Sequence, residues 1–311
     1  MARYLVTGGA GFIGSHLAHR LVADGHELRV LDDLSTGHRD NLEAIEHDLE
    51  LIEGSFVDFD ICRRAADGVD YVLHQGALPS VPKSIELPCE THHANVTGTL
   101  NLLVAARDAG VKRFVYAASS SAYGDTPTLP KVETMPASPK SPYAVQKYTG
   151  ELYCRTFFDS YGLETVALRY FNIFGPRQDP NSPYSAVIPL FVRACREGRA
   201  PTIFGDGTTS RDFTYVDNVV EANLAAATAP AACAGKVYNV ACGERIDLTA
   251  LAETIRREVG TGEPPEYAPE RPGDVKHSLA DVQRARDDFG YAPVVPFAEG
   301  IRRTVAWYLG R

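Results

Sequence analysis

The 311-residue sequence lacks the features that mark exported, membrane-spanning or nucleic-acid-binding proteins. Its six cysteines are scattered and form no Cys-x-x-Cys pair, which favours free thiols in a reducing compartment over a disulfide framework. No run approaches the ~18 apolar residues that a bilayer-spanning helix needs, and the opening MARYLVTGG has no apolar signal region. The net charge of −9 argues against nucleic acid and anionic membranes as partners. We therefore expect a cytoplasmic protein with neither partner.

Metal-ligand clusters are scarce as well. His92 and His93 are adjacent, but neighbouring residues on a helix point to different faces, so we expect no metal site. The composition, with 44% apolar and 23% charged residues, is ordinary for a globular protein that buries a substantial core.

The first 172 residues alternate short apolar runs with amphipathic segments. Strands that alternate with helices predict βαβ units and a parallel sheet, whose ligands bind at the carboxyl ends of the strands. Buried strands are expected at residues 3–7, 27–31, 49–53, 70–74, 113–119 and 165–170.

The sequence changes character after residue 172, where FGPRQDPNSPYSAVIP is rich in proline and polar residues. A helix in DFTYVDNVVEANLAAATA and a strand in KVYNVA are expected to return to the sheet. The C-terminal segment that follows is expected to have helices near 248–260, 281–288 and 298–309. The predicted fold is α/β: a Rossmann-type doubly wound parallel sheet with a smaller C-terminal substrate-binding lobe. The sheet takes residues 1–172 and about 211–241, and the lobe takes about 173–210 and 242–311.

Glycines follow the first predicted strand directly. Gly8, Gly11 and Gly14 lie between strand and helix, and Gly9, Gly11 and Gly14 satisfy G-x-G-x-x-G. A tight turn that lets a diphosphate approach the backbone needs residues without a Cβ, and the following helix N-terminus offers N–H groups to the anion. The sequence therefore predicts a dinucleotide site.

A carboxylate follows the second predicted strand. Asp32 lies eighteen residues after Gly14, with Asp33 beside it. An aspartate at this place accepts hydrogen bonds from the adenosine ribose and repels a 2′-phosphate, which favours NAD over NADP. The alternative is an aspartate that only caps the loop.

The stretch SPYAVQK places Tyr143 four residues before Lys147, so both lie on one face of a helix whose first turn accommodates Pro142. A fixed ammonium is expected to lower the pKa of the phenol and to make Tyr143 a general base. Ser119 and Ser120 end the fifth predicted strand, where a hydroxyl can share a proton with the reacting oxygen. The alternatives are a surface Tyr–Lys pair and a polar strand end.

These motifs, with LRYFNIFGPRQ, resemble the extended short-chain dehydrogenase/reductase family over essentially the whole chain. Within it, the chain is similar to the nucleotide-sugar 4-epimerases, and most closely to bacterial UDP-N-acetylhexosamine 4-epimerases. That closer similarity rests on YAASSSAYGD, GPRQDPNSPYSAVIP, GDGTTSRDFTYVDN, YNVACGERIDL and GDVKHSLAD.

The resemblance implies a reaction. Tyr143 takes the proton from the sugar O4 while C4 passes hydride to NAD, and the transient 4-keto sugar turns over in the pocket before hydride and proton return. NAD is expected to stay tightly bound and to be recycled in place.

The resemblance also implies which residues bind each ligand. The expected cofactor contacts are Gly8, Gly11, Phe12, Ile13, Gly14, Asp32, Asp33, Ser35, Thr36, Gly37, Ser55, Phe56, Gln75, Gly76, Ala77, Asn95, Tyr143, Lys147 and Tyr170. The expected substrate contacts are Ser80, Ser119, Tyr143, Asn172, Ala186, Val187, Phe204, Arg211, Arg271, Asp274 and Ser278. Ser55 departs from the pattern, because relatives usually have an aspartate there to meet adenine.

The site residues discriminate among related activities. Dehydratases carry an Asp–Glu pair where this chain has Ser120 and Ser121, and Asp179 would repel a uronate. Ser278 stands where epimerases restricted to UDP-glucose and UDP-galactose have tyrosine, so a 2-acetamido group has room. We expect interconversion of UDP-GlcNAc and UDP-GalNAc, and less efficiently of UDP-Glc and UDP-Gal. The alternatives are a UDP-glucose or UDP-glucuronate 4-epimerase, a net oxidoreductase and a non-catalytic NAD(P) sensor.

Helices expected near 91–109 and 143–161 have more apolar residues than one packing face needs. In relatives, two such helices form a four-helix bundle across a dimer axis, so we expect a homodimer. The surplus residues are Leu100, Leu103, Tyr148, Leu152 and Phe157.

Overall fold

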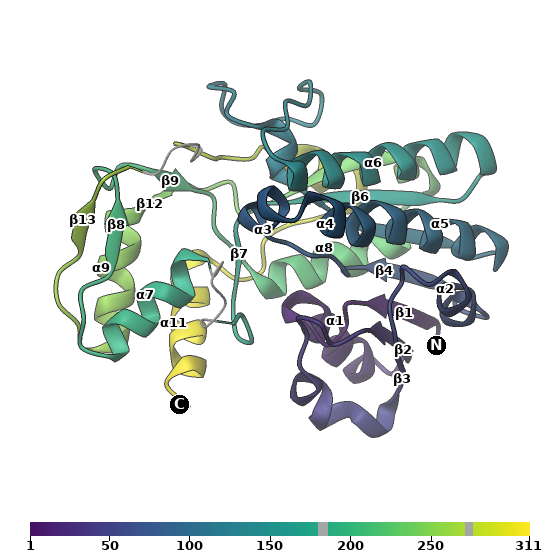
Figure 1. The fold of residues 1–311 in the computed structure, drawn as a ribbon, viewed down its shortest axis with the longest axis horizontal. Helices are drawn as coiled ribbons and strands as arrows, with labels where there is room; N and C mark the ends of the chain where they lie inside the picture. Colours follow the sequence, from purple (N-terminus) through teal and green to yellow (C-terminus); the bar gives the residue numbers. More distant parts are fainter. Residues whose placement is uncertain (180–185, 271–275) are drawn as a thin grey trace.

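Seven parallel strands form the central sheet of the computed structural model, in the order β11-β6-β5-β4-β1-β2-β3 (Figure 1). The predicted Rossmann-type sheet is confirmed, and each predicted strand is present to within one residue. The strand order reverses between β1 and β4, the place at which such sheets bind ligands. The strands are β1 Arg3–Thr7, β2 Glu27–Asp32, β3 Leu49–Glu53, β4 Tyr71–His74, β5 Arg113–Ser119, β6 Thr165–Tyr170 and β11 Lys236–Val240.

The structure describes residues 1–179, 186–270 and 276–311. Arg271 and Asp274, two of the predicted substrate contacts, lie outside the described residues. Within the described part of the chain, no helix has the length and apolar content needed to cross a membrane.

Helices cover both faces of the sheet, because the strands are apolar on both sides. In β2, Val30 faces the core beneath α1, whereas its neighbour Leu31 belongs to the core on the opposite face. The first face carries α1 Phe12–Ala23, α8 Val216–Thr228, α10 Gln283–Phe289 and the 3-10 helix Arg39–Asp48. The second face carries α2 Phe59–Ala66, α5 Thr99–Asp108 and α6 Pro142–Tyr161.

The helix expected near 91–109 is present as an unbroken helical run over residues 88–108, but it is not α-helical throughout. It is divided into α4 Pro88–His92, a π-helical turn at His93–Gly98 and α5. Within the turn, the carbonyl of Asn95 accepts a bond from the Thr99 hydroxyl at 2.7 Å. π-helical turns concentrate at functional sites, and this one holds a predicted cofactor contact. A short helix, α3 Val81–Glu86, precedes α4.

A second core lies beside the sheet and is formed by α7 Val187–Arg196, α9 Leu248–Val259 and α11 Phe297–Tyr308 (Figure 1). Phe213 and Tyr215 belong to this core, so the returning segment joins the sheet only from α8 onward. The division into two domains stays a prediction. Three short strand pairs border the second core: β7 Ile173–Phe174 with β10 Thr214–Tyr215, β8 Thr202–Phe204 with β13 Glu266–Ala268, and β9 Ser210–Arg211 with β12 Ile246–Asp247.

The apolar residues expected on the outer faces of α5 and α6 divide into two groups. Leu103 and Phe157 are buried in the core of the same chain, so they are not surplus. Leu152 is 50% exposed, and Leu100 and Tyr148 are partly exposed. Val145, which was not among the expected residues, is 49% exposed on α6. The outer face of α6 is therefore apolar, but fewer residues contribute to it than the sequence predicted.

Candidate active site

The glycine loop after β1 has no space for side chains. Gly8 has φ +65°, and a Cβ there would lie 2.7 Å from the Cα of Gly76. A Cβ on Gly14 would lie 2.0 Å from the carbonyl oxygen of Gly8. The helix begins at Phe12, and its N-cap Gly11 has no side chain to bond the first N–H groups. A diphosphate is the kind of group that these N–H donors bind, so the residues fit a dinucleotide.

Two side chains in the predicted cofactor loop point elsewhere. Phe12 and Ile13 pack against the second core, where Phe12 lies close to Gly175. Their side chains therefore join the start of α1 to the second core, while their backbone N–H groups belong to the first turn of the helix.

Asp32 is 6% exposed and shapes the loop that follows β2. Its Oδ2 accepts the N–H of Ala10 at 2.9 Å, and its Oδ1 accepts the N–H of Leu34 at 2.8 Å. Burial raises the pKa of this carboxyl, and the two bonds oppose that shift. A carboxylate has about four acceptor positions, so capping leaves capacity for ribose hydroxyls. Capping and ribose binding are therefore compatible.

The rest of this loop is held by the neighbouring carboxylate and by packing on the glycine loop. The exposed Asp33 accepts the N–H of the exposed Ser35 at 3.0 Å. Thr36 is exposed, whereas Gly37 packs on the glycine loop, with room for no Cβ beside Ala10.

The side chain of Phe56, a predicted cofactor contact, is buried and packs against two glycines. Its ring lies where a Cβ on Gly76 or Gly98 would be, at 2.6 Å and 2.3 Å respectively. Ser55 precedes it and accepts the N–H of Val57 at 3.3 Å. Both glycines are therefore required by the ring that packs under the end of β4.

A buried triangle of hydrogen bonds joins the ends of β4 and β6. The Tyr170 hydroxyl donates to Gln75 Oε1 at 3.1 Å, Gln75 Nε2 donates to Asn223 Oδ1 at 3.0 Å, and Asn223 Nδ2 donates to Tyr170 at 2.8 Å. The sequence reasoning missed Asn223, because nothing in the pattern of α8 distinguishes an inward asparagine. Ala77 lies just beyond this triangle and is partly exposed.

Tyr143 and Lys147 lie on the first turns of α6, as predicted. Ser141 caps the helix by accepting the N–H of Ala144 at 3.2 Å, and Pro142 occupies the first turn. The N–H of Tyr143 donates to Ser84 Oγ at 3.0 Å, a contact with α3 that the sequence did not indicate. Lys147 is 4% exposed, and its Nζ donates to the carbonyl of Ala117 at 2.8 Å.

The predicted lowering of the Tyr143 pKa is not found for the groups of the chain alone. Burial raises the pKa of Tyr143 to about 12, and a hydrogen bond with Ser119 only partly opposes the shift. Burial also lowers the pKa of Lys147 to about 8. Both groups are pushed toward their neutral forms, because removal from water disfavours whichever form carries charge.

The serine run lies beside the phenol. Ser119 Oγ accepts the N–H of Ser121 at 3.2 Å and also the Ser121 hydroxyl at 2.8 Å. Ser120 begins the short 3-10 turn Ser120–Tyr123 and is partly exposed. Ser119 thus combines the strand-end role with a contact to Tyr143, so both interpretations from the sequence apply to it.

Asn95 and Ser80 make structural bonds. Asn95 is 1% exposed and its amide bonds both backbone groups of Leu78, at 2.7 Å and 3.2 Å, and Gln146 Oε1 at 2.9 Å. Ser80 caps α3 by accepting the N–H of Lys83 at 3.0 Å. The two residues fix the loop after β4 against α6, and the sequence did not predict the partner Gln146.

Two predicted substrate contacts, Asn172 and Ser278, bind each other. Asn172 has φ +42°, and its Nδ2 donates to Ser278 Oγ at 3.1 Å and to the carbonyl of Asp212 at 3.0 Å. Ser278 also accepts the N–H of Asp212 at 3.4 Å. The small residue expected to leave space therefore has a hydroxyl that is already bonded.

Asp212, which the sequence reasoning missed, organises this part of the molecule. Its carboxylate is fully buried and accepts N–H groups of Cys242 at 3.0 Å, Gly243 at 3.1 Å and Ala280 at 3.2 Å. Burial raises its pKa to about 6 against the opposing effect of these bonds. Segments from three places in the sequence meet at one carboxylate.

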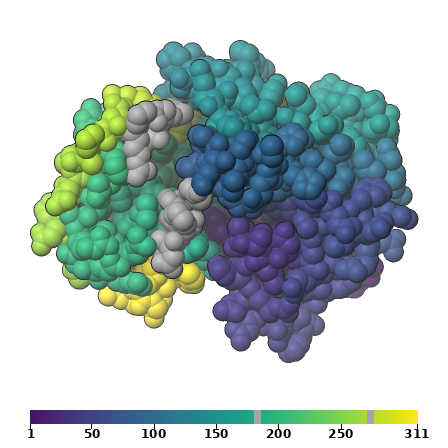
Figure 2. Space-filling view, viewed as in Figure 1, coloured from purple at the N-terminus to yellow at the C-terminus, as the bar shows by residue number. Residues whose placement is uncertain are grey.

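The remaining predicted substrate contacts border the second core. Arg211 Nη1 donates to the carbonyls of Ser210 at 3.0 Å and Lys276 at 3.2 Å. The others are Phe204 at the end of β8, the exposed N-cap Ala186 and the partly exposed Val187. In Figure 2 the N-terminal residues (purple and blue) and those of the second core (mainly green and yellow) occupy opposite sides of the visible face.

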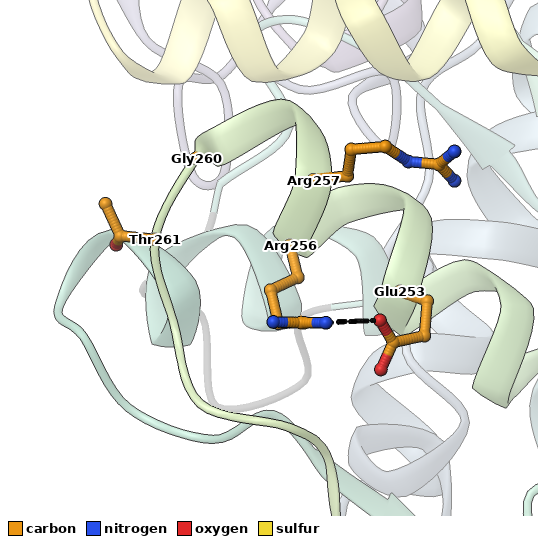
Figure 3. A pocket seen from close by; sticks show the side chains of 5 residues that line it. All are labelled: Glu253, Arg256, Arg257, Gly260 and Thr261. Carbon is orange, nitrogen blue, oxygen red and sulfur yellow. Dashed lines mark hydrogen bonds and ion pairs between the residues drawn. The ribbon is translucent and has the colours of Figure 1, made fainter.

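Two surface hollows lie away from these residues. One, of about 390 Å³, is at the end of α9 and is lined by Glu253, Arg256, Arg257, Gly260 and Thr261 (Figure 3). There Arg256 points to Glu253 and donates to it at 2.7 Å. The other, of about 300 Å³, lies beside β3 and is lined by Arg39, Leu42, Glu46, His47, Leu49 and Leu51. None of these residues was predicted to bind a ligand.

Known proteins share both the sequence and the fold. The chain is 40% identical over 310 residues, 98% of each protein, to a UDP-glucose 4-epimerase of Mycolicibacterium smegmatis. The structure of UDP-N-acetylglucosamine 4-epimerase from Methanobrevibacter ruminantium, in complex with UDP-N-acetylmuramic acid, has TM-score 0.95 and 40% identity over 99% of this chain and 98% of that one. UDP-glucose 4-epimerase of Thermus thermophilus, in complex with NAD, has TM-score 0.88 and 37% identity over 99% of each chain. The family model matches residues 4–241, and the chain belongs to the NAD dependent epimerase/dehydratase family.

Proposed function

We propose that the protein is an NAD-dependent 4-epimerase of UDP-sugars that interconverts UDP-GlcNAc and UDP-GalNAc, and UDP-Glc and UDP-Gal less efficiently. The observation that carries the proposal is the placement of Tyr143, Lys147 and Ser119 together at the carboxyl edge of β5. The same edge of the sheet carries the glycine loop and Asp32. Proton-transfer groups thus lie on the edge at which a dinucleotide binds.

The residues divide the work as follows. The first turn of α1 and Asp32 hold NAD, which when bound supplies a hydride acceptor and donor for C4 of the sugar. Tyr143 accepts the proton of the sugar O4 and later returns it, and Ser119 shares that proton through its hydroxyl. Lys147, together with the positive charge of oxidised NAD when it is bound, provides positive charge that opposes the effect of burial on the phenol and favours the phenolate. Epimerisation needs no carboxylate near C5, and Ser120 and Ser121 supply none.

The preference for N-acetylated sugars rests on two features. The relative from Methanobrevibacter ruminantium was solved with UDP-N-acetylmuramic acid, which carries an acetamido group. Ser278 is small, although its hydroxyl is bonded to Asn172. The second candidate, a UDP-glucose 4-epimerase, is favoured by the relative from Mycolicibacterium smegmatis. A UDP-glucuronate 4-epimerase is disfavoured by the charge of Asp179.

Product analysis tests the proposal. Purified protein is incubated with UDP-GlcNAc, UDP-Glc or UDP-glucuronate without added cofactor, and we expect UDP-GalNAc to form fastest. Tyr143→Phe should lower turnover by about 10²- to 10⁴-fold while bound NAD is retained. Protein that holds NAD but forms no product would be a sensor, and a requirement for added NADH or NADPH would indicate a reductase.

Ser278→Tyr tests the choice of sugar. The tyrosine ring would fill the space assigned to the acetamido group, so turnover of UDP-GlcNAc should be lost while turnover of UDP-Glc is kept or rises. A missing group is discriminated by only about 1–3 kcal/mol, so the wild type should accept both sugars. Unchanged kinetics with UDP-GlcNAc in this variant would remove the argument from pocket size.

We further propose a cytoplasmic homodimer joined through α5 and α6 as a four-helix bundle. The dimer is supported by the half-exposed Val145 and Leu152 on α6. The cytoplasmic location is supported by the six cysteines, which are all free. Leu152→Glu should give a monomer in sedimentation, and the exposed Tyr267→Glu on β13 serves as the control that leaves the mass unchanged.

A further inference from the structure

Lys147 is a buried cation that has no carboxylate partner among the residues that the structure describes. Its Nζ donates to the Ala117 carbonyl at 2.8 Å, and its side chain is almost fully enclosed. A buried ammonium is strongly disfavoured unless nearby groups stabilise the charge. One hydrogen bond to a carbonyl oxygen stabilises the ammonium less than the hydration shell that it has lost, so another group must contribute.

The ring of Tyr116 supplies the second contact. Lys147 Nζ lies over this ring at 5.0 Å from its centroid, within the range at which a cation is attracted to an aromatic face. The Tyr116 hydroxyl donates to the Lys147 carbonyl at 3.3 Å, so the ring is fixed to the same residue at a second point. Gly150 makes room for it, because a Cβ there would lie 2.2 Å from the Tyr116 hydroxyl oxygen.

We propose that Tyr116 is a positioning residue whose aromatic face keeps Lys147 protonated beside Tyr143. The inference rests on the proposed function, since it takes Lys147 as the charge that favours the phenolate. A carboxylate could also hold the ammonium, but its negative charge would oppose the effect of the ammonium on Tyr143. A neutral ring attracts the cation and leaves its net charge in place.

The other groups around Lys147 do not replace the ring. Cys154 faces it from α6 and Tyr143 lies one turn earlier on the same helix, and burial raises the pKa of both, so they are neutral at physiological pH. His74 faces it from β4, where burial and the nearby ammonium lower its pKa to about 3. Among these groups, only Tyr116 is placed with its electron-rich face under the ammonium.

The test is the pKa of Lys147 measured by NMR titration of protein with labelled lysine side chains, in which Lys147→Arg identifies the signal. Tyr116 is replaced by phenylalanine, 4-fluorophenylalanine and 3,4,5-trifluorophenylalanine. Fluorine weakens the negative face of the ring but nearly preserves its shape. We expect phenylalanine to resemble the wild type and the pKa to fall with each fluorine, by about one unit in total.

A second measurement uses turnover. Because Lys147 would lose its proton at lower pH, the alkaline limb of kcat should move to lower pH in the same order of variants. A pKa that is equal in the phenylalanine and trifluorophenylalanine proteins would overturn the proposal, as would a shift that is already complete in phenylalanine. The titration needs no turnover, so it stays decisive even if the protein proves not to be an epimerase.

Discussion

The glycine loop at the carboxyl edge of the sheet and the polar cluster at the border of the second core are held in place by different means. At the sheet, close contact of backbone atoms fixes the glycine loop, since Gly8 and Gly14 have no space for a side chain. At the second core, side-chain hydrogen bonds among Asn172, Asp212 and Ser278 join segments that carry only short strands. Steric constraint is insensitive to pH and to small changes of bond geometry, whereas a polar cluster responds to both.

This difference assigns separate tasks to the two regions. A nucleotide that stays bound needs a rigid cradle, which backbone packing provides. A sugar that must present both faces of C4 needs a border that can adapt, and bonds worth about 0.5–1.5 kcal/mol each allow that. The predictions below test whether the two regions differ in this way.

The largest effect is expected at Gly8. Gly8→Ala adds both an unfavourable positive φ and a clash with Gly76, so it should cost about 3–6 kcal/mol of unfolding free energy and abolish NAD retention. Gly110→Ala is the matched control, because Gly110 has φ +69° but open space around it, and should cost about 1 kcal/mol. Urea denaturation measures both, and equal costs would show that crowding does not fix the loop.

Acid should weaken the sheet through His74. This fully buried ring is bonded to Thr7 Oγ1 at 2.6 Å and Thr99 Oγ1 at 2.9 Å, and its pKa is lowered to about 3. Below pH 6.5 the imidazole of His74 binds a proton in the unfolded chain but stays neutral in the native protein, so the free energy of unfolding falls as pH falls toward 3. Between pH 7 and pH 4 the loss should reach about 3 kcal/mol. His74→Asn should remove that part of the slope, and an unchanged slope would contradict it.

The second core should respond with the opposite sign. The pKa of Asp212 is raised to about 6, so between its unfolded value near 3.8 and pH 6 the native state holds a proton that the unfolded chain has lost. Stability from this group is present below pH 3.8 and is lost as pH rises through 6, by about 2–3 kcal/mol. In Asp212→Asn the unfolding free energy should therefore rise more steeply with pH between 4 and 6 than in the wild type.

The smallest effect is expected at Ser278. Ser278→Ala removes one acceptor of Asn172 Nδ2 and should cost about 1 kcal/mol. KM for the UDP-sugar should rise while NAD retention stays unchanged, because the cradle is independent of this cluster. Ser160→Ala, exposed on α6, is the control. Loss of NAD in Ser278→Ala would show that the regions are coupled.

Local patterns in the sequence predicted most strands of the central sheet. Continuous apolar runs such as RFVYAAS mark strands that are buried on both faces, and Gly8-x-x-Gly11 follows β1 where the pattern requires it. β13 was not predicted, because it is three residues long and is held only by pairing with β8. Such pairing is a long-range property that no window of the sequence contains.

The polar partners of the site were the main omission. Asn223, Gln146 and Ser84 act through contacts 51 to 148 residues away in the sequence, and each looks like an ordinary helix residue. The sign of the shift at Tyr143 was also missed, because i to i+4 spacing shows that Lys147 shares its helix face but not that both groups lose water. Desolvation depends on the whole fold.

The side chain of Phe12 has a consequence for cofactor exchange. It anchors the start of α1 in the second core, although the same turn belongs to the nucleotide cradle. If the second core moved away from the sheet to release a sugar, this anchor would resist the movement at a turn that also binds the coenzyme. Product release would then loosen only the contacts to the sugar. An enzyme built in this way can bind and release many substrate molecules while it keeps one coenzyme molecule.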